Sequence, residues 1–322
     1  MEKPLGWGWE FRQKSSMIHQ IDPTICPFAS SRKTTLAASS FPAVWHDSHE
    51  GRLEAMVDIA VAAGRHTLGY FRRQELIVDL KADESPVTVA DREAEQEARK
   101  RIASRYPADA VAGEEFADVR GTSDYRWTID PIDGTKSFVC GVPLYSTLLA
   151  LEYQDEPVGG AIILPALREA VVAAVGGGCY YSDDLEQWRA TRVSDRKELS
   201  AAVFVTSEVQ SFVDRGDPSA FERMQSSCWL TRTWGDGYGY MMVATGRADV
   251  MVDPICKAWD VAAILPILSE AGGRFTDWAG RSTVRGGDGV GTNGRLHDAA
   301  LAVLAGKAST PAQDDAHPTR AS

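Results

Sequence analysis

The sequence predicts an α/β fold in which helices and β-sheets are stacked in layers. Strand-like segments and segments of helical periodicity are mixed along the whole chain, which favours layered sheets over a helical bundle or a β-sandwich. Hydrophobic residues make up 44% of the 322 residues and charged residues 25%, so the chain can bury a sizeable core. No unit of roughly 20–50 residues repeats, which argues against a solenoid or a propeller.

In the first half of the chain, two amphipathic helices are expected to precede four strands. Apolar residues recur at steps of three and four from about position 50 to 73, beginning with Leu53 and Met56. A second helix is expected at Asp91–Tyr106. Turn residues then separate four runs that are typical of strands: Tyr125–Ile129, Ser146–Tyr153, Val158–Leu164 and Glu169–Val175.

The second half continues the same mixture, and two folded parts are expected in all, at 49–180 and 181–306. Strands are expected at Ala202–Ser207 and Ala248–Asp253, and helices near Phe212–Met224, Gly239–Ala244 and Asp260–Ala271. Pro266 lies within the last of these helices, where it should bend the helix or remove one backbone hydrogen bond.

The two ends of the chain differ in composition from the rest. From Pro23 to Trp45 there is no acidic residue, and serine and threonine are frequent. Residues 1–48 are therefore expected to be a disordered extension or an organellar transit peptide, unless the start codon has been assigned too far upstream. The polar segment 307–322 is expected to be disordered.

Charge and cysteine content limit the partners and the compartment. The formal net charge of −11 argues against nucleic acid or an anionic membrane, because either would favour a basic surface. No apolar run approaches the ~18 residues of a membrane-spanning helix. The five cysteines are scattered without a CxxC pair, which indicates free thiols and a cytoplasmic location, unless residues 1–48 direct import. If the substrate is an anion, a local positive charge such as a metal ion is needed.

The segment WTIDPIDGTKSF, Trp127–Phe138, has the residues of a metal and phosphate site. The proline after Asp130 keeps that residue extended, and Gly134 permits a sharp turn or a close approach of a ligand. Asp130 and Asp133 could converge on a hard cation such as Mg²⁺, which prefers oxygen ligands. Thr135 could open a helix whose first amides suit a phosphate. Turns and helix caps use the same residues, so the segment alone does not decide.

Three further motifs place carboxylates at the ends of expected elements. AGEEF contains Glu114 beside Glu115, PVTVAD places Asp91 at a helix start, and KAWDVAAI does the same for Asp260. Each has an ordinary explanation, as a helix cap or a solvated turn. A fourth motif, CPFASSR at Cys26–Arg32, has the spacing of a cysteine phosphatase loop, but its proline removes an amide that the loop would need.

In this order, PVTVAD, GEE, DPIDGT and WD with a downstream EAGG resemble the inositol monophosphatase superfamily. The resemblance spans about Leu53 to Leu304. It implies a layered αβαβα sandwich of the inositol monophosphatase and fructose-1,6-bisphosphatase type. It also implies a homodimeric, lithium-sensitive phosphomonoesterase that uses two or three Mg²⁺ ions. No histidine lies in a motif, and neither a DxDxT segment nor a P-loop is present, so other phosphatase classes fit poorly.

The resemblance also implies roles for individual metal-binding residues. Glu114, Asp130 and the carbonyl of Ile132 would hold one metal. Asp130, Asp133 and Asp260 would hold a second, and Glu114 would help to position a third through water. The metals would neutralise the phosphate and activate a water that attacks phosphorus in line, without a covalent enzyme intermediate.

Other matched positions concern the water and the phosphate. Asp91 and Thr135 would orient and deprotonate the attacking water, and the amides of Gly134 and Thr135 would bind the phosphate. Lys81 matches a lysine near the site and is expected to contact the substrate, although a solvated surface lysine explains it as well.

Within the superfamily, Trp234–Pro254 together with FVCGVPLYSTLLAL and TDWAG look like the histidinol-phosphatase branch. Histidinol carries an ammonium and an imidazole, which suit a pocket with extra carboxylates, whereas inositol carries only hydroxyls. Asp236, Tyr238 and Asp253 are therefore expected to contact the substrate, although Asp236 could cap a turn and Tyr238 could be a core aromatic. An inositol-1-phosphate phosphatase, a broad-specificity member and a non-catalytic metal or phosphate binder stay open as alternatives.

Overall fold

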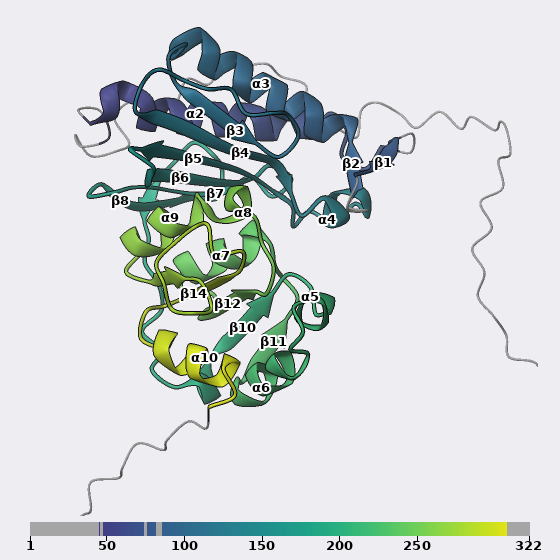
Figure 1. The fold of residues 1–322 in the computed structure, drawn as a ribbon, viewed down its shortest axis with the longest axis vertical. Coiled ribbons are helices and arrows are strands. Elements are labelled where there is room, and N and C mark those ends of the chain that lie inside the picture. The colour runs from purple at the N-terminus through teal and green to yellow at the C-terminus, as the bar shows by residue number, and fades with distance from the viewer. Residues whose placement is uncertain (1–44, 46–47, 74–75, 82–85, 308–322) are drawn as a thin grey trace, which may run out of the picture. The chain divides into compact units, whose positions relative to one another are not determined.

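The computed structural model describes residues 45, 48–73, 76–81 and 86–307 (Figure 1). Most of the N-terminal extension, nearly all of the tail and the motif at Cys26–Arg32 lie outside these residues. Within them, no helix has the length and apolar character needed to cross a bilayer. The four cysteines that the structure describes are all free thiols.

The first sheet has seven strands in the order β3-β4-β5-β6-β7-β8-β9, and all neighbours are antiparallel except β3 and β4. Its strands are β3 (Ala110–Gly113), β4 (Tyr125–Asp133), β5 (Ser146–Tyr153), β6 (Glu156–Leu164), β7 (Glu169–Ala174), β8 (Gly178–Ser182) and β9 (Arg189–Ala190). A separate two-stranded ribbon pairs β1 (Val78–Leu80) with β2 (Pro86–Thr88).

Strand β5 shows why helices must cover both faces of this sheet. Its apolar residues are consecutive rather than alternating, and successive side chains of a strand point to opposite faces. Leu148 accordingly packs in one core and Leu149 in another. A leucine side chain buried in this way contributes about 2 kcal/mol of transfer free energy.

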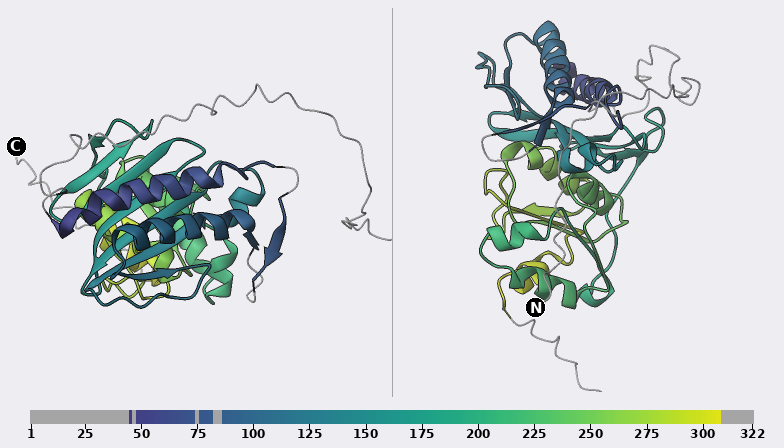
Figure 2. Two further views of the ribbon diagram at one scale, coloured as in Figure 1. Left: turned by 90° about the horizontal axis from the view of Figure 1, so that it is seen from above. Right: turned by 90° about the vertical axis from the view of Figure 1, so that its right-hand side faces the viewer.

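Helices α2 (Arg52–Thr67) and α3 (Val89–Arg105) lie side by side over the outer face of the first sheet (Figure 2). Helix α3 begins with a capping box: the Thr88 hydroxyl accepts a hydrogen bond from the amide of Ala90, and the Asp91 carboxylate accepts one from the amide of Thr88 at 2.8 Å. The short 3₁₀ turn η2 (His49–Gly51) precedes α2.

The second sheet has five strands in the order β11-β10-β12-β14-β13. These are β10 (Val203–Thr206), β11 (Leu230–Arg232), β12 (Val250–Asp253), β13 (Arg274–Thr276) and β14 (Gly289–Thr292). Helices α7 (Gly237–Ala244), α8 (Ala258–Val261) and α9 (Ile264–Glu270) fill the layer between the two sheets. The outer face of the second sheet is covered by α5 (Gln210–Asp214), α6 (Ser219–Ser227) and α10 (His297–Leu304). The remaining short elements are α4 (Thr135–Val139) and η3 (Leu199–Ala201).

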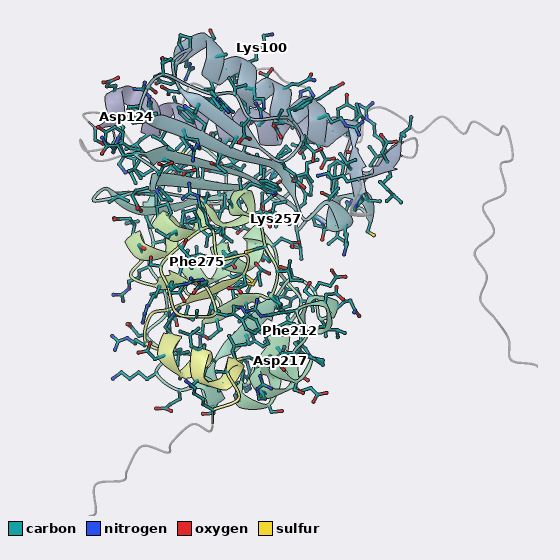
Figure 3. All side chains as sticks on the ribbon, in the orientation of Figure 1. Lys100, Asp124, Phe212, Asp217, Lys257 and Phe275 are labelled. Atoms are coloured by element: carbon teal, nitrogen blue, oxygen red, sulfur yellow. The ribbon has the colours of Figure 1, made fainter. Side chains whose placement is uncertain are left out.

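These layers make the αβαβα sandwich that the sequence analysis expected (Figure 1). Three large hydrophobic cores hold it together. They lie between the first sheet and helices α2 and α3, between the two sheets, and between the second sheet and its outer helices. A smaller cluster includes Phe138 and Tyr145. Phe275 belongs to the core between the sheets and Phe212 to the core under the outer helices (Figure 3).

Two helices differ from the expected ones in a way that their own residues explain. The helix expected near Phe212–Met224 is two helices, α5 and α6, with Gly216 and Pro218 between them. The helix expected from Asp260 is divided into α8 and α9, and Pro266 lies in the first turn of α9, where its missing amide hydrogen costs no helical bond. The helix is therefore divided just before Pro266 and does not lose a hydrogen bond within α9.

Candidate active site

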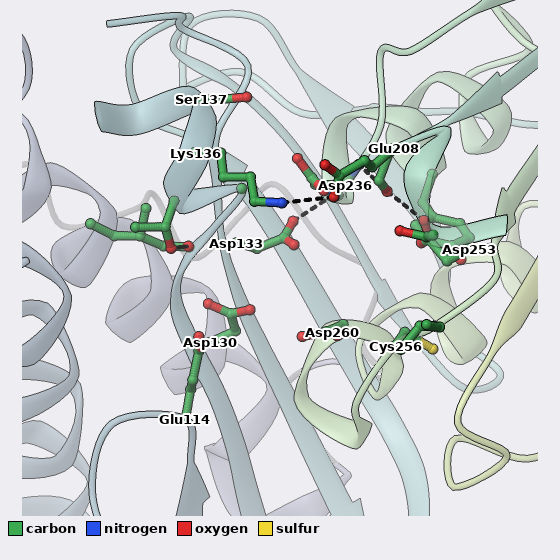
Figure 4. Close-up of a pocket in the computed structure, with 18 of the residues that line it drawn as sticks. Glu114, Asp130, Asp133, Lys136, Ser137, Glu208, Asp236, Asp253, Cys256 and Asp260 are labelled. Carbon is green, nitrogen blue, oxygen red and sulfur yellow. Dashed lines mark hydrogen bonds and ion pairs between the residues drawn. The ribbon is translucent and has the colours of Figure 1, made fainter. Parts of the chain in front are cut away.

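A cavity of about 490 Å³ opens where β4, β10 and β12 end and where α4, α7 and α8 begin (Figure 4). Its lining combines carboxylates from both sheets and from the helices between them. Eight acidic residues and a single cation, Lys136, line it among the residues that the structure describes. The acidic residues are Glu114, Asp130, Asp133, Glu208, Asp214, Asp236, Asp253 and Asp260.

A break in the pairing of β4 brings Asp130 and Asp133 to the same cavity. The register with β5 shifts between these two residues, and the Thr147 hydroxyl donates to the carbonyl of Pro131 at 2.7 Å inside the break. In a regular strand, residues three apart point to opposite faces. The irregularity is therefore what allows both carboxylates to line the cavity.

The two carboxylates are buried together, and only one of them is well bonded. Asp133 accepts hydrogen bonds from the Ser146 hydroxyl at 2.6 Å and from the Gly237 amide at 2.5 Å. One oxygen of Asp130, Oδ1, is buried without any hydrogen-bond partner among the described residues. An unpartnered buried carboxylate oxygen is costly unless a cation satisfies it.

Burial and mutual repulsion shape the electrostatics of this site. Burial, followed by the charges of Glu114 and Asp133, raises the pKa of Asp130 well above its usual range. Burial and the charges of Asp236 and Asp260 do the same to the pKa of Asp133. Burial also raises the pKa of Asp260 to about 7. Divalent cations would reverse each of these shifts.

The donor set fits Mg²⁺, since it consists of hard carboxylate oxygens and includes the Ile132 position at the cavity surface. Among the described residues, no three acidic, histidine or cysteine side chains already form a closed ligand cluster. Carboxylates that repel one another are expected to draw together only around a cation.

Glu114 is tied to the β1–β2 ribbon through Lys81. The Lys81 ammonium donates to Glu114 at 2.6 Å and to Glu115 at 2.7 Å. Burial opposes the charge of Lys81, yet the hydrogen bonds to the two glutamates raise its pKa. Lys81 does not line the cavity itself and reaches the site through Glu114.

The turn after β4 provides the second half of the site. Gly134 has a φ of 82°, and a Cβ at this position would lie 2.7 Å from a carboxylate oxygen of Asp236. The Thr135 hydroxyl donates to the carbonyl of Ile132 at 3.0 Å and to Oδ1 of Asp91 at 3.4 Å. Asp91 is buried behind the cavity lining, where its other oxygen accepts from Thr88.

The wall formed where β10 and β12 end and α7 begins carries Asp236 and Asp253, two of the four residues expected to contact substrate. Ser207 joins them: its hydroxyl donates to Asp253 and accepts from the amide of Asp236. Asp253 is buried, and burial raises its pKa to about 7. Asp236 has a φ of 55°, a conformation that costs an aspartate roughly 1–3 kcal/mol and that clusters at functional sites.

Tyr238, the third expected contact, does not line the cavity. The guanidinium of Arg247 lies over its ring, 5.7 Å from the centroid. Tyr240 lines the cavity instead, because residues two apart on a helix point about 200° away from each other. The core-aromatic alternative describes Tyr238 better, since it packs against the core between the sheets.

Sequence reasoning did not single out Lys136, Ser207, Glu208 or Tyr240 as parts of the site, although all line the cavity. Lys136 follows Thr135 directly, and Ser207 and Glu208 follow an expected strand, so each had a positional signal. These positions alone could not be assigned to the site, because no local feature of the sequence shows that β10 and β4 end at one cavity.

The cavity is acidic, lies at the ends of strands, and adjoins the Gly134 turn, which is followed by the first amides of α4. These features are typical of enzymes that act on phosphate esters with the help of divalent cations. The model of the Inositol monophosphatase family matches residues 49–309. The chain belongs to this family.

Individual relatives agree with the family. A histidinol-phosphatase of Chlorobaculum parvum is 41% identical over 238 residues, which cover 74% of this chain and 90% of the relative. An inositol-1-monophosphatase of Rhizobium meliloti is 34% identical, over 71% of this chain and 86% of the relative. The solved inositol monophosphatase of Zymomonas mobilis is 30% identical, with a TM-score of 0.69 over 80% of this chain and 99% of that one. The protein is thus an enzyme, a phosphoric monoester hydrolase of a magnesium-dependent family.

Proposed function

We propose that the enzyme hydrolyses L-histidinol phosphate to L-histidinol and phosphate, with two or three Mg²⁺ ions and as a homodimer. The observation that carries the proposal is the presence of two further carboxylates, Asp236 and Asp253, in the cavity besides the paired aspartates of β4. A neutral polyol does not need these charges. A leaving alcohol with an ammonium and an imidazole would be attracted by them. The similarity to histidinol-phosphatases supports the same substrate.

The proposed metal ligands are those on the β4 side of the cavity. Glu114, Asp130, Asp133, Asp260 and the Ile132 carbonyl would hold the ions. When bound, Mg²⁺ supplies positive charge that neutralises the phosphate oxygens and makes water more acidic.

The chain's own groups would position the reacting parts. The amides that follow Gly134 would bind phosphate oxygens at the start of α4. The Thr135 hydroxyl would orient the attacking water and pass its proton to Asp91, to which it is already directed. Lys81 would hold Glu114 in place. Asp236 and Asp253 would bind the cationic alcohol.

The proposal is tested by Mg²⁺-dependent phosphate release from L-histidinol phosphate and myo-inositol 1-phosphate on one preparation, with Asp130→Asn as the blank. A preference for histidinol phosphate of about 100-fold in kcat/KM, roughly 2.7 kcal/mol of transition-state discrimination, supports it. A preference for inositol phosphate contradicts the substrate and leaves the class of reaction intact. Loss of all activity in EDTA with recovery on Mg²⁺ checks the cofactor.

A further inference from the structure

Lys136 and Glu208 form an ion pair at the cavity, with the Lys136 ammonium 2.7 Å from the Glu208 carboxylate (Figure 4). Lys136 lies in α4, directly after the turn formed by Gly134 and Thr135. Glu208 follows β10 and is next to Ser207, which bonds Asp253 and Asp236. The pair therefore joins the phosphate turn to the wall proposed for the alcohol.

This pair can be separated at little cost. The side chain of Lys136 is 68% exposed and that of Glu208 is 46% exposed. Exposed ion pairs are worth only about 0–1 kcal/mol, because solvent screens them. The carboxylates of Asp130 and Asp133 are buried instead, so their environment is fixed by the fold.

A phosphate ester would compete for Lys136. It brings about two negative charges to the turn beside this residue. Lys136 is the one cation among the described residues that line the cavity, so the phosphate has no other side-chain ammonium or guanidinium there to approach. If Lys136 turns to the phosphate, Glu208 loses its partner. A cationic alcohol would supply a new partner for Glu208, and a neutral alcohol would not.

We propose that Lys136 and Glu208 exchange partners when substrate binds, and that this exchange makes Glu208 a specificity-determining residue for phosphate esters of cationic alcohols. The inference rests on the proposed function and adds Glu208 to it. The exchange conserves the number of ion pairs only for a cationic substrate, so its benefit is confined to that class.

Steady-state kinetics of Glu208→Gln on L-histidinol phosphate and myo-inositol 1-phosphate test the exchange. We expect kcat/KM to fall about 10-fold on the cationic ester and less than about twofold on the neutral one, as for loss of a single partly exposed charge contact. The matched control is Asp183→Asn, which breaks an equally exposed ion pair with Arg189 outside the cavity. It should leave both values unchanged.

The charge-swapped double variant Lys136→Glu/Glu208→Lys distinguishes two roles of Glu208: recognition of a cationic substrate, and support of the loop through its ion pair with Lys136. It can restore the bridge but not the negative charge that faces the substrate. If the ion pair only supports the loop, the double variant should regain the kcat/KM that Glu208→Gln loses, and the inference is overturned. Equal losses on both esters in Glu208→Gln, or no loss on either, overturn it as well.

The outcomes also separate this inference from the proposed function. A wild-type enzyme that hydrolyses both esters but prefers the neutral one contradicts the proposed substrate. The change in the cationic-to-neutral ratio caused by Glu208→Gln still decides the exchange in that case. A wild-type enzyme with no activity on the cationic ester contradicts both.

Discussion

The two acidic walls of the cavity differ in how much freedom their charges have. On the β4 wall, Asp130 and Asp133 are only 2% and 8% exposed, and one carboxylate oxygen has no bonded partner among the described residues. On the wall after β10, Glu208 is exposed and already paired with Lys136. Asp130 and Asp133 are thus buried charges that lack a counter-ion, whereas Glu208 lies near solvent and already has one.

Under the proposed function, the difference corresponds to a division between residues that bind the metals and residues that select the substrate. Charges for chemistry must be held rigidly, so the fold tolerates their repulsion in the absence of a counter-ion. A charge that adds to the choice of leaving group, as proposed for Glu208, can stay near solvent, where an exchange of partners costs little. Substitutions in the two walls should therefore have effects that differ in kind as well as in size.

The largest effect is expected from Asp130→Asn. Activity should fall by at least about 1,000-fold, because the side chain lies at the centre of the proposed metal site. The metal-free variant should nevertheless be more stable to unfolding by about 1–3 kcal/mol, since one of several repelling buried charges is gone. Phosphate release and thermal unfolding in EDTA measure both. Asp214→Asn removes an exposed carboxylate from the same cavity and should change neither by much. If Asp130→Asn is less stable than the wild type, the difference drawn between the two walls is wrong.

A second prediction concerns the turn between the walls. In Gly134→Ala the new Cβ would lie 2.7 Å from Asp236, so we expect activity to fall about 100-fold while the fold survives. Gly176→Ala is the matched control, since Gly176 has a similar φ of 73° and no atom within 4 Å. Both variants should lose about 1 kcal/mol of stability from backbone strain. If the two variants are equally active, the close contact between Gly134 and Asp236 is not needed for activity.

His297 gives a reference for pH effects outside both walls. Its ring is buried between Thr276 and Thr292, and burial, followed by the charge of Arg274, lowers its pKa to about 4 while Asp298 opposes this. Above pH ~6.5 neither state of the chain binds this proton. Below it the unfolded chain does, so stability should fall by about 1.5 kcal/mol between pH 6.5 and 5, by about 3 kcal/mol in all, and level off below pH 4. Denaturant unfolding of the wild type and of His297→Gln across this range checks the slope, which the variant should lack.

The smallest effect is expected from the strain at Asp236. In Asp236→Gly the positive φ no longer penalises the residue, so the free energy of unfolding should rise by about 1 kcal/mol. Selectivity for the cationic ester should decrease at the same time. Asp236→Asn keeps the strain and removes only the charge, and should lower selectivity without the gain in stability. If both variants are equally stable, the strain is not stored at this residue.

How much could be predicted from the sequence depends on whether a signal is local. The central strands are apolar runs bounded by turn residues, α2 has clear helical periodicity, and the helix expected to be disturbed at Pro266 is divided just before it. Strands β11 and β13 have three residues each, too few to show a period of two. At the site, the motif carboxylates were singled out by their positions. Tyr238 and Tyr240 could not be told apart without the orientation of α7, and Glu208 could not be paired with Lys136 without the fold.

The irregular pairing of β4 has a consequence for how this site could arise or be lost. The site needs one more residue on β4 than on β5 between the two paired positions, and a substitution cannot change that number. Asp130 pairs with Leu148 and Asp133 with Ser146, so three steps along β4 lie opposite two steps along β5. If the same residues paired regularly with β5, one aspartate would turn to the other face of the sheet. Such a chain could still fold into the same layers. The site is therefore robust to substitution at most positions and vulnerable to a shift of this pairing by one residue.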